Sequence, residues 1–150
     1  MSFFYYQDID PKTDINGSNS SLNYYGAVVD IQPEYRFTSW FALGLDVELG
    51  GYSGEHFYFQ SYITTKFTAS LNALDLWGEV GFGPGTMVGD YYYSYEVEHG
   101  ATWTLLARVK VGATYRFNES SGIGIHVGVA SGIPAPSVFV VPGVHYSYKF

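Results

Sequence analysis

The chain has 150 residues, which is enough for one domain and too few for two of ordinary size. It contains no cysteine, so disulfides, thiolate metal sites and cysteine nucleophiles are excluded, and its net charge of −7 argues against a nucleic-acid partner. Charged residues make up only 14% of the chain and aromatic residues reach 19%, a balance that fits poorly with a cytosolic α/β enzyme.

Most of the chain alternates apolar and polar residues with the period of two that is typical of β-strands. This pattern predicts seven strands, at residues 26–37, 41–50, 56–68, 73–83, 101–117, 123–130 and 137–150. An eighth strand is expected from Ser2 to about Asp8, where consecutive aromatic residues leave the register undefined. No apolar run is long enough for a transmembrane helix, but a transmembrane strand needs only about 10 alternating residues.

The connections between these strands alternate in length along the chain. Long or polar connections are expected at residues 9–21, 51–55, 84–100 and 132–136, and short ones at 38–40, 69–72 and 118–121. Long connections at one end and short turns at the other are typical of an up-and-down barrel that crosses a membrane.

Charged residues of the strands lie on the polar face of the alternation, together with ten of the glycines. The acids and bases on that face are equal in number, as expected for charges enclosed together, and small glycines leave room for long ionic side chains. We therefore predict that this face lines the inside of the barrel, as a structural ion-pair network of Asp30, Glu34, Arg36, Asp46, Glu48, Lys66, Asp75, Glu79, Arg108, Lys110, Arg116 and Lys149.

One ion pair within this network is predicted specifically. If the hairpin across residues 69–72 is regular, Lys66 and Asp75 fall at a similar depth on adjacent strands and on the same face. Cross-strand opposite charges of this kind stabilise a sheet.

The surplus negative charge falls on the connections, most of it on the long ones. The connection at 84–100 also carries a tyrosine run, and aromatic side chains in exposed loops supply contact area at little entropic cost. These tyrosines form a possible interaction surface, Tyr91, Tyr92, Tyr93 and Tyr95. The alternative is that the strands extend beyond the membrane and the tyrosines belong to an aromatic girdle.

The C-terminal strand ends on Phe150, with Tyr146 and Tyr148 at alternating preceding positions. This ending resembles the β-signal by which bacterial outer-membrane proteins are recognised for assembly. The whole layout resembles the small eight-stranded barrels of the OmpA/OmpX type. The resemblance implies an all-β, eight-stranded antiparallel up-and-down transmembrane barrel, with short periplasmic turns and longer extracellular loops.

The same resemblance implies residence in the bacterial outer membrane. The implied partners are the lipid bilayer, or detergent in its place, and the outer-membrane assembly machinery. No secretion signal precedes the first strand, and we expect that one has been removed and that Met1 and Ser2 were added for expression. A wholly engineered barrel with no cellular role is the alternative.

The histidines of the last two strands invite a chemical interpretation. His145 and Ser147 resemble the His-x-Ser of the lipid A deacylase barrel, but here the alternation directs both towards the lumen at the short-turn end. His126 is also lumenal, at a different depth from His145 on an adjacent strand, so no metal pair is expected. We therefore predict no catalytic residue, no metal ligands and no cofactor.

Fold alone does not determine function for this architecture. The predicted role is structural or surface-interactive, adhesin-like, through acidic and Tyr-rich extracellular loops that bind an extracellular ligand. The alternatives are the passage of small or hydrophobic solutes across the outer membrane and, least favoured, an enzyme that modifies membrane lipid.

Overall fold

The computed structural model describes the backbone of residues 2–8, 23–52, 56–93, 96–133 and 137–149, and the side chains within 26–51, 57–86, 103–132 and 140–149. The described chain is built from β-strands, and it contains no helix that is long and apolar enough to span a membrane. The strands are β1 (Ser2–Asp8), β2 (Asn23–Ile31), β3 (Glu34–Arg36), β4 (Phe41–Tyr52), β5 (His56–Leu71), β6 (Leu74–Tyr93), β7 (Glu96–Arg116), β8 (Ser121–Ile133) and β9 (Ser137–Tyr148).

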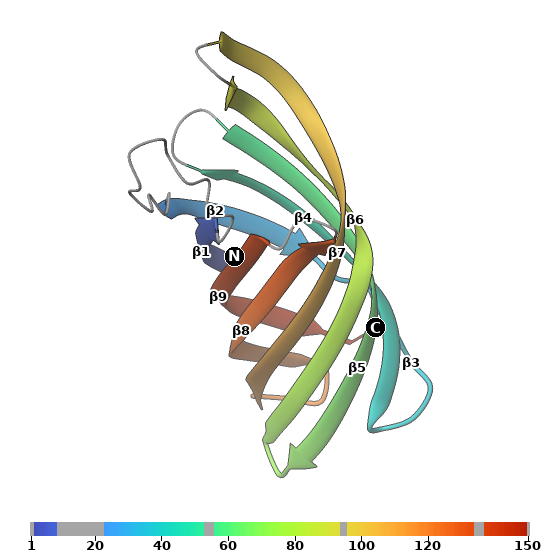
Figure 1. Cartoon of the computed structure of the whole chain (residues 1–150). Helices are drawn as coiled ribbons and strands as arrows, with labels where there is room; N and C mark the ends of the chain where they lie inside the picture. The colour runs from blue at the N-terminus through green and yellow to red at the C-terminus, as the bar shows by residue number, and fades with distance from the viewer. Residues whose placement is uncertain (1, 9–22, 53–55, 94–95, 134–136, 150) are drawn as a thin grey trace.

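The strands close into a barrel (Figure 1). All paired strands are antiparallel, β2 pairs with both β1 and β4, and β1 completes the ring by pairing with β9. Ile31 lies opposite Val47 and Glu34 lies opposite Gly44, so β2 and β3 keep one register and form a single strand interrupted at Pro33. Proline has no N–H to donate to the ladder, which accounts for the interruption. The predicted eight-stranded antiparallel up-and-down barrel is confirmed.

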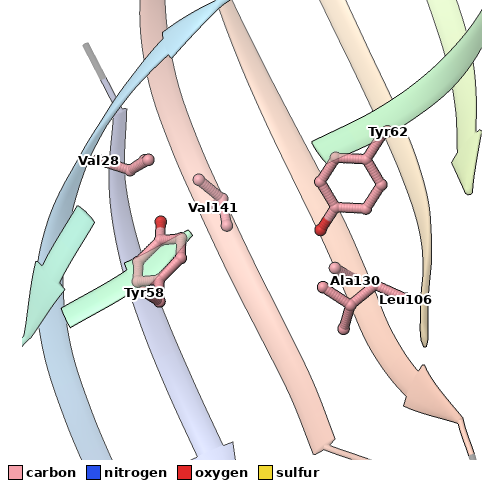
Figure 2. Close-up of a cluster of buried hydrophobic side chains, with 6 residues drawn as sticks. All are labelled: Val28, Tyr58, Tyr62, Leu106, Ala130 and Val141. Atoms are coloured by element: carbon pink, nitrogen blue, oxygen red, sulfur yellow. The ribbon is translucent and has the colours of Figure 1, made fainter. Parts of the chain in front are cut away.

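Neighbouring residues of one strand show which face is inside. Tyr62 is fully buried whereas Ile63 is 72% exposed, and Val109 is 52% exposed between Arg108 and Lys110, each of which is 2% exposed. The charged face therefore lies inside the barrel and the apolar face outside. A small apolar cluster also lies in the interior (Figure 2), formed by Val28, Tyr58, Tyr62, Leu106, Ala130 and Val141.

The short turns connect strands tightly, and one of them differs from the predicted position. β5 continues to Leu71 and β6 begins at Leu74, so the turn is Asn72–Ala73, with Asn72 at a positive φ of 55°. Asparagine tolerates this left-handed conformation better than most residues. The resulting register sets Lys66 opposite Glu79 and Asp75 opposite Ser70. The predicted pairing of Lys66 with Asp75 is therefore wrong.

The segment 84–100 was predicted to be a loop, and most of it is paired strand. β6 and β7 remain in register from Leu74 opposite Tyr115 to Tyr93 opposite Glu96. Proline and glycine favour loops in a sequence, but Gly85 has a packing role here, because a Cβ on it would lie 2.5 Å from Leu106 Cδ1 in the interior. The hairpin extends past its neighbours at the top of Figure 1.

Closure of the barrel between β1 and β9 can be tested with cysteine pairs, because the chain has no cysteine of its own. Tyr5 lies opposite Val140, and directly paired residues of antiparallel strands are about 4.5–5.5 Å apart at Cα, within disulfide range. Tyr5→Cys with Val140→Cys should cross-link under mild oxidation, as seen by mass spectrometry. Tyr5→Cys with Pro142→Cys, offset by two residues, is the control, and equal cross-linking of both pairs would contradict this register.

Candidate functional site: the charged interior of the barrel

Arg108 of β7 is at the centre of the buried charge. Its Nη2 lies 2.5 Å from Asp46 Oδ2 and 2.8 Å from Glu79 Oε1, and its Nη1 donates to Glu48 Oε1. The guanidinium also lies over the ring of Tyr62, 4.0 Å from the centroid. A planar guanidinium has several N–H donors in a fixed fork, so it suits this position between three carboxylates.

Lys110, two residues further along β7, binds carboxylates from the opposite side of the barrel. Its Nζ lies 2.7 Å from Asp46 Oδ2, 3.0 Å from Glu48 Oε1 and 3.6 Å from Asp30 Oδ2. The ligand oxygens of these three acids lie within 4.8 Å of one another, a grouping that could hold a metal ion. The lysine ammonium lies among them and supplies the positive charge that they require.

Most of these contacts join strands that are not neighbours in the sheet, since among the strands that carry the acids only β6 pairs directly with β7. Arg108 and Lys110 come from β7, whereas their acids come from β2, β4 and β6. Gln32, in the interruption between β2 and β3, adds a further contact by donating to Glu79. We call these residues the central cluster: Asp30, Gln32, Asp46, Glu48, Tyr62, Glu79, Arg108 and Lys110.

Two further ion pairs lie nearer the short turns. Lys66 Nζ is 2.5 Å from Glu34 Oε1 and 4.4 Å from the centroid of the Trp77 ring. Arg116 Nε is 3.2 Å from Asp75 Oδ2, and the Arg116 side chain is 28% exposed. These pairs are more accessible to water than the central cluster, so they contribute less to stability.

Ten of the twelve charged residues predicted for the network take part in ion pairs, either in the central cluster or in these outer pairs. The other two, Arg36 and Lys149, are exposed, and within the described side chains neither has an ion pair. Arg36 ends β3 and Lys149 follows β9, so both lie at the short-turn end of the barrel.

The two lumenal histidines lie in contact, against the expectation that their depths would separate them. His126 Nδ1 lies 3.4 Å from His145 Nδ1, and the ring centroids are 5.5 Å apart. Thr114 Oγ1 is 2.8 Å from His145 Nε2 and accepts a hydrogen bond from Trp77 Nε1 at 3.1 Å. We call these four residues, Trp77, Thr114, His126 and His145, the imidazole cluster.

The histidine contact has a sequence signal that the alternation alone does not reveal. His126 lies opposite Gly143 and His145 lies opposite Gly124, so each ring faces a residue without a side chain. Each imidazole can therefore extend diagonally towards the other. The depths do differ by two residues, as predicted, but the diagonal distance between neighbouring strands is within reach of side chains of this size.

A cavity of about 580 Å³ separates the imidazole cluster from the short-turn end. It extends from Asp30 and Lys110 of the central cluster to the turn residues Glu119 and Ser120. Both imidazoles and Trp77 line it, so this part of the interior has room for water and small solutes, whereas Asp46, Glu48 and Arg108 of the central cluster do not line it.

Ser147 does not form a catalytic pair with His145 in the described structure. Its Oγ donates to the Gly122 carbonyl oxygen at 3.5 Å, whereas both nitrogens of His145 contact other residues. Among the residues of the C-terminal signal, Tyr146 and Tyr148 are 64% and 55% exposed on the outer face, and Phe150 lies outside the described residues.

The predicted interaction surface lies on the β6–β7 hairpin. Tyr91, Tyr92 and Tyr93 are strand residues, with Cα partners Glu98, Val97 and Glu96, and Tyr95 lies outside the described residues. The strands therefore extend through this segment, and both the interaction surface and the aromatic girdle stay predictions for these tyrosines.

No family model and no curated protein matches this sequence. Solved structures do match the fold. The chain superposes on Neisserial surface protein A with a TM-score of 0.68 at 7% identity, covering 99% of this chain and 94% of that one. For the N-terminal β-barrel domain of Pseudomonas aeruginosa OprF the TM-score is 0.57 at 12% identity, covering 98% and 95%. For the outer membrane enzyme PagL it is 0.57 at 11% identity, covering 99% of each chain. The chain therefore has the fold of the small outer-membrane β-barrels.

The central cluster gives a stability prediction. Arg108→Met leaves Lys110 as the cation for Asp46 and Glu48 and removes the ion pair of Glu79, and breaking a buried ion pair costs about 3–5 kcal/mol. Arg116→Met removes a more exposed pair and should cost about 0–1 kcal/mol. Urea unfolding in detergent, followed by tryptophan fluorescence, measures both free energies. Adding Glu79→Gln to Arg108→Met should restore part of the loss, and equal costs for the two single variants would contradict the assigned geometry.

Proposed function

We propose that this protein is an outer-membrane barrel that anchors and displays the β6–β7 hairpin as an interaction surface. The observation that carries the proposal is the length of this hairpin beyond the barrel wall. Among the described residues, β5 pairs with β6 no further than Val88, and β8 pairs with β7 no further than Leu105. Gly89–Tyr93 therefore pairs only with residues 96–100 of the same hairpin.

The outer face of the barrel supports residence in a membrane. Large apolar side chains are exposed on every strand from β4 to β8, including Leu45, Ile63, Val80, Val109 and Ile125. Soluble monomers rarely expose a continuous apolar surface of this extent, whereas a transmembrane barrel requires one.

An aromatic band at the short-turn end supports the same conclusion. Tyr35 and Phe37 contact edge to face with centroids 4.9 Å apart, and Trp40 stacks on Phe67 at 6.1 Å. Tyr35, Phe37 and Trp40 are each more than half exposed. Aromatic residues at this position are typical of the boundary between lipid and water.

The hairpin has the composition of a contact surface. Asp90, Glu96 and Glu98 give it three negative charges, and its strands carry neither lysine nor arginine between residues 89 and 100. The tyrosines on β6 add aromatic contact area next to this charge. A partner with a basic surface is therefore favoured, because complementary charge raises the rate of association.

The filled interior of the barrel favours display of the β6–β7 hairpin over the passage of solutes. Arg108, Lys110 and Leu106 are at most 2% exposed and lie on one strand in the middle of the barrel. Eight-stranded barrels enclose an interior that side chains fill. Catalysis on membrane lipid has no support from the predicted His-x-Ser, because among the described residues His145 contacts Thr114 and His126 and not Ser147.

Membrane residence predicts a strong asymmetry between two substitutions. Val109→Arg places a charge near the middle of the outer face, where lipid would surround it, at a cost of about 2–4 kcal/mol. Ser39→Arg, in an exposed short turn, should change stability by no more than about ±0.5 kcal/mol. Unfolding titrations in lipid vesicles compare the two variants. A soluble barrel would tolerate both equally, and that result would contradict membrane residence.

Display predicts that the hairpin is needed for binding but not for folding. Gly89 lies opposite Gly100, so residues 90–99 can be replaced by Asn-Gly without a change of register. The shortened protein should keep the heat-dependent mobility of a folded barrel on detergent gels.

The binding measurement uses the intact and shortened proteins in nanodiscs against immobilised extracellular-matrix proteins that have basic surfaces. Shortening should lower the affinity at least tenfold, and raised salt should weaken binding to the intact protein, because charges are screened over about 3 Å at 1 M. Replacing the three hairpin acids by Asn, Gln and Gln separates charge from shape. Equal binding by the intact and shortened proteins would contradict the proposal.

A further inference from the structure

The imidazole cluster is constructed around two glycines that leave space for its rings. A Cβ on Gly124 would lie 2.5 Å from His145 Cε1, and a Cβ on Gly112 would lie 2.4 Å from Trp77 Cζ2. Any side chain at either position would force a ring out of its place. The pair of imidazoles and the indole beside them therefore occupy a space that the backbone provides for them.

The separation of the two ring nitrogens suits a shared metal ion. His126 Nδ1 and His145 Nδ1 are 3.4 Å apart. Two histidine nitrogens that bind one tetrahedral zinc ion, each at 2.0–2.1 Å, lie about 3.3–3.4 Å from one another. A hydrogen bond from a ring N–H is usually shorter, at about 2.9–3.0 Å.

The residues around His145 are compatible with the protonation state that a ligand needs. Trp77 Nε1 donates to Thr114 Oγ1, which lies 2.8 Å from His145 Nε2. The threonine oxygen has two lone pairs, so it can also accept from His145 Nε2–H. In that tautomer the Nδ1 of His145 is unprotonated and faces His126. Histidines that bind metals usually donate their other N–H to an oxygen in this way.

The positive charges near the imidazoles are already paired with carboxylates. The cavity beside the imidazoles is also lined by Lys66 and Lys110, but both ammonium groups are held by carboxylates, Lys66 by Glu34 and Lys110 by Asp46 and Glu48. At about 580 Å³ the cavity is large enough for water molecules, which would complete the coordination shell.

We propose that His126 and His145 bind one divalent transition-metal ion, of the zinc or copper class, through their Nδ1 atoms. The site is separate from the acids around Lys110, where the lysine ammonium already provides the cation. It is open to the cavity at the short-turn end and does not depend on the proposed role of the hairpin. Imidazole is a preferred ligand of both metals, with copper bound more tightly than zinc.

Trp77 provides a reporter for the test, because its ring centroid is 5.5 Å from that of His145 and 6.1 Å from that of His126. In the tag-free protein with Trp40→Phe and Trp103→Phe, Trp77 is the only tryptophan. Titration with Cu²⁺ in detergent should quench its fluorescence and saturate at one equivalent. Excess Zn²⁺ should reverse the quenching.

Matched variants in this background identify the ligands. His126→Asn and His145→Asn should each weaken the apparent Cu²⁺ affinity at least tenfold, whereas His99→Asn, on the β6–β7 hairpin, should leave it unchanged. Calorimetric titration with Zn²⁺ gives an independent stoichiometry, and heat-dependent gel mobility verifies that each variant is folded. Quenching that persists in the double variant His126→Asn/His145→Asn, or the absence of any saturable binding to the parent, would overturn the proposal.

Discussion

Arg108 and Lys110 on one strand bind carboxylates that belong to three others, and two of those strands, β2 and β4, are not neighbours of β7 in the sheet. These contacts can form only when the sheet curls until opposite walls face each other. Closure in turn satisfies the backbone of every strand, because a closed barrel has no unpaired edge along its paired length. Closure therefore lets these charges pair, and the ion pairs in turn join opposite walls of the barrel.

Alternation along the strands was sufficient to predict the fold and the orientation of both faces. The period of two places Arg108 and Lys110 on one face of the sheet and Val109 on the other, whichever strand lies beside them. Which acid each base binds could not be predicted in the same way, because partners across the barrel depend on every register between them. Because the turn lies at Asn72–Ala73, the register of β5 with β6 differs by four residues from the predicted one. Glu79, and not Asp75, therefore lies opposite Lys66.

The β6–β7 hairpin and the histidine pair were missed for a different reason. Glycine and proline between residues 81 and 89 are ordinary loop signals, yet in this barrel glycine serves to admit large neighbours such as Leu106 into the interior. Glycines opposite His126 and His145 likewise leave the space in which the two rings make contact. A pattern that records only apolar and polar residues does not record where a missing side chain leaves room for another.

The independence of the distal hairpin also bears on how this protein can diversify. Within the described chain, residues 89–100 pair only with each other and with no other strand of the barrel. Folding therefore places little constraint on their identity. Adding or removing the same even number of residues on each arm preserves the side of the sheet on which every remaining residue lies. Variants of the hairpin can therefore arise while the interior charges and the pairing of the wall remain as they are.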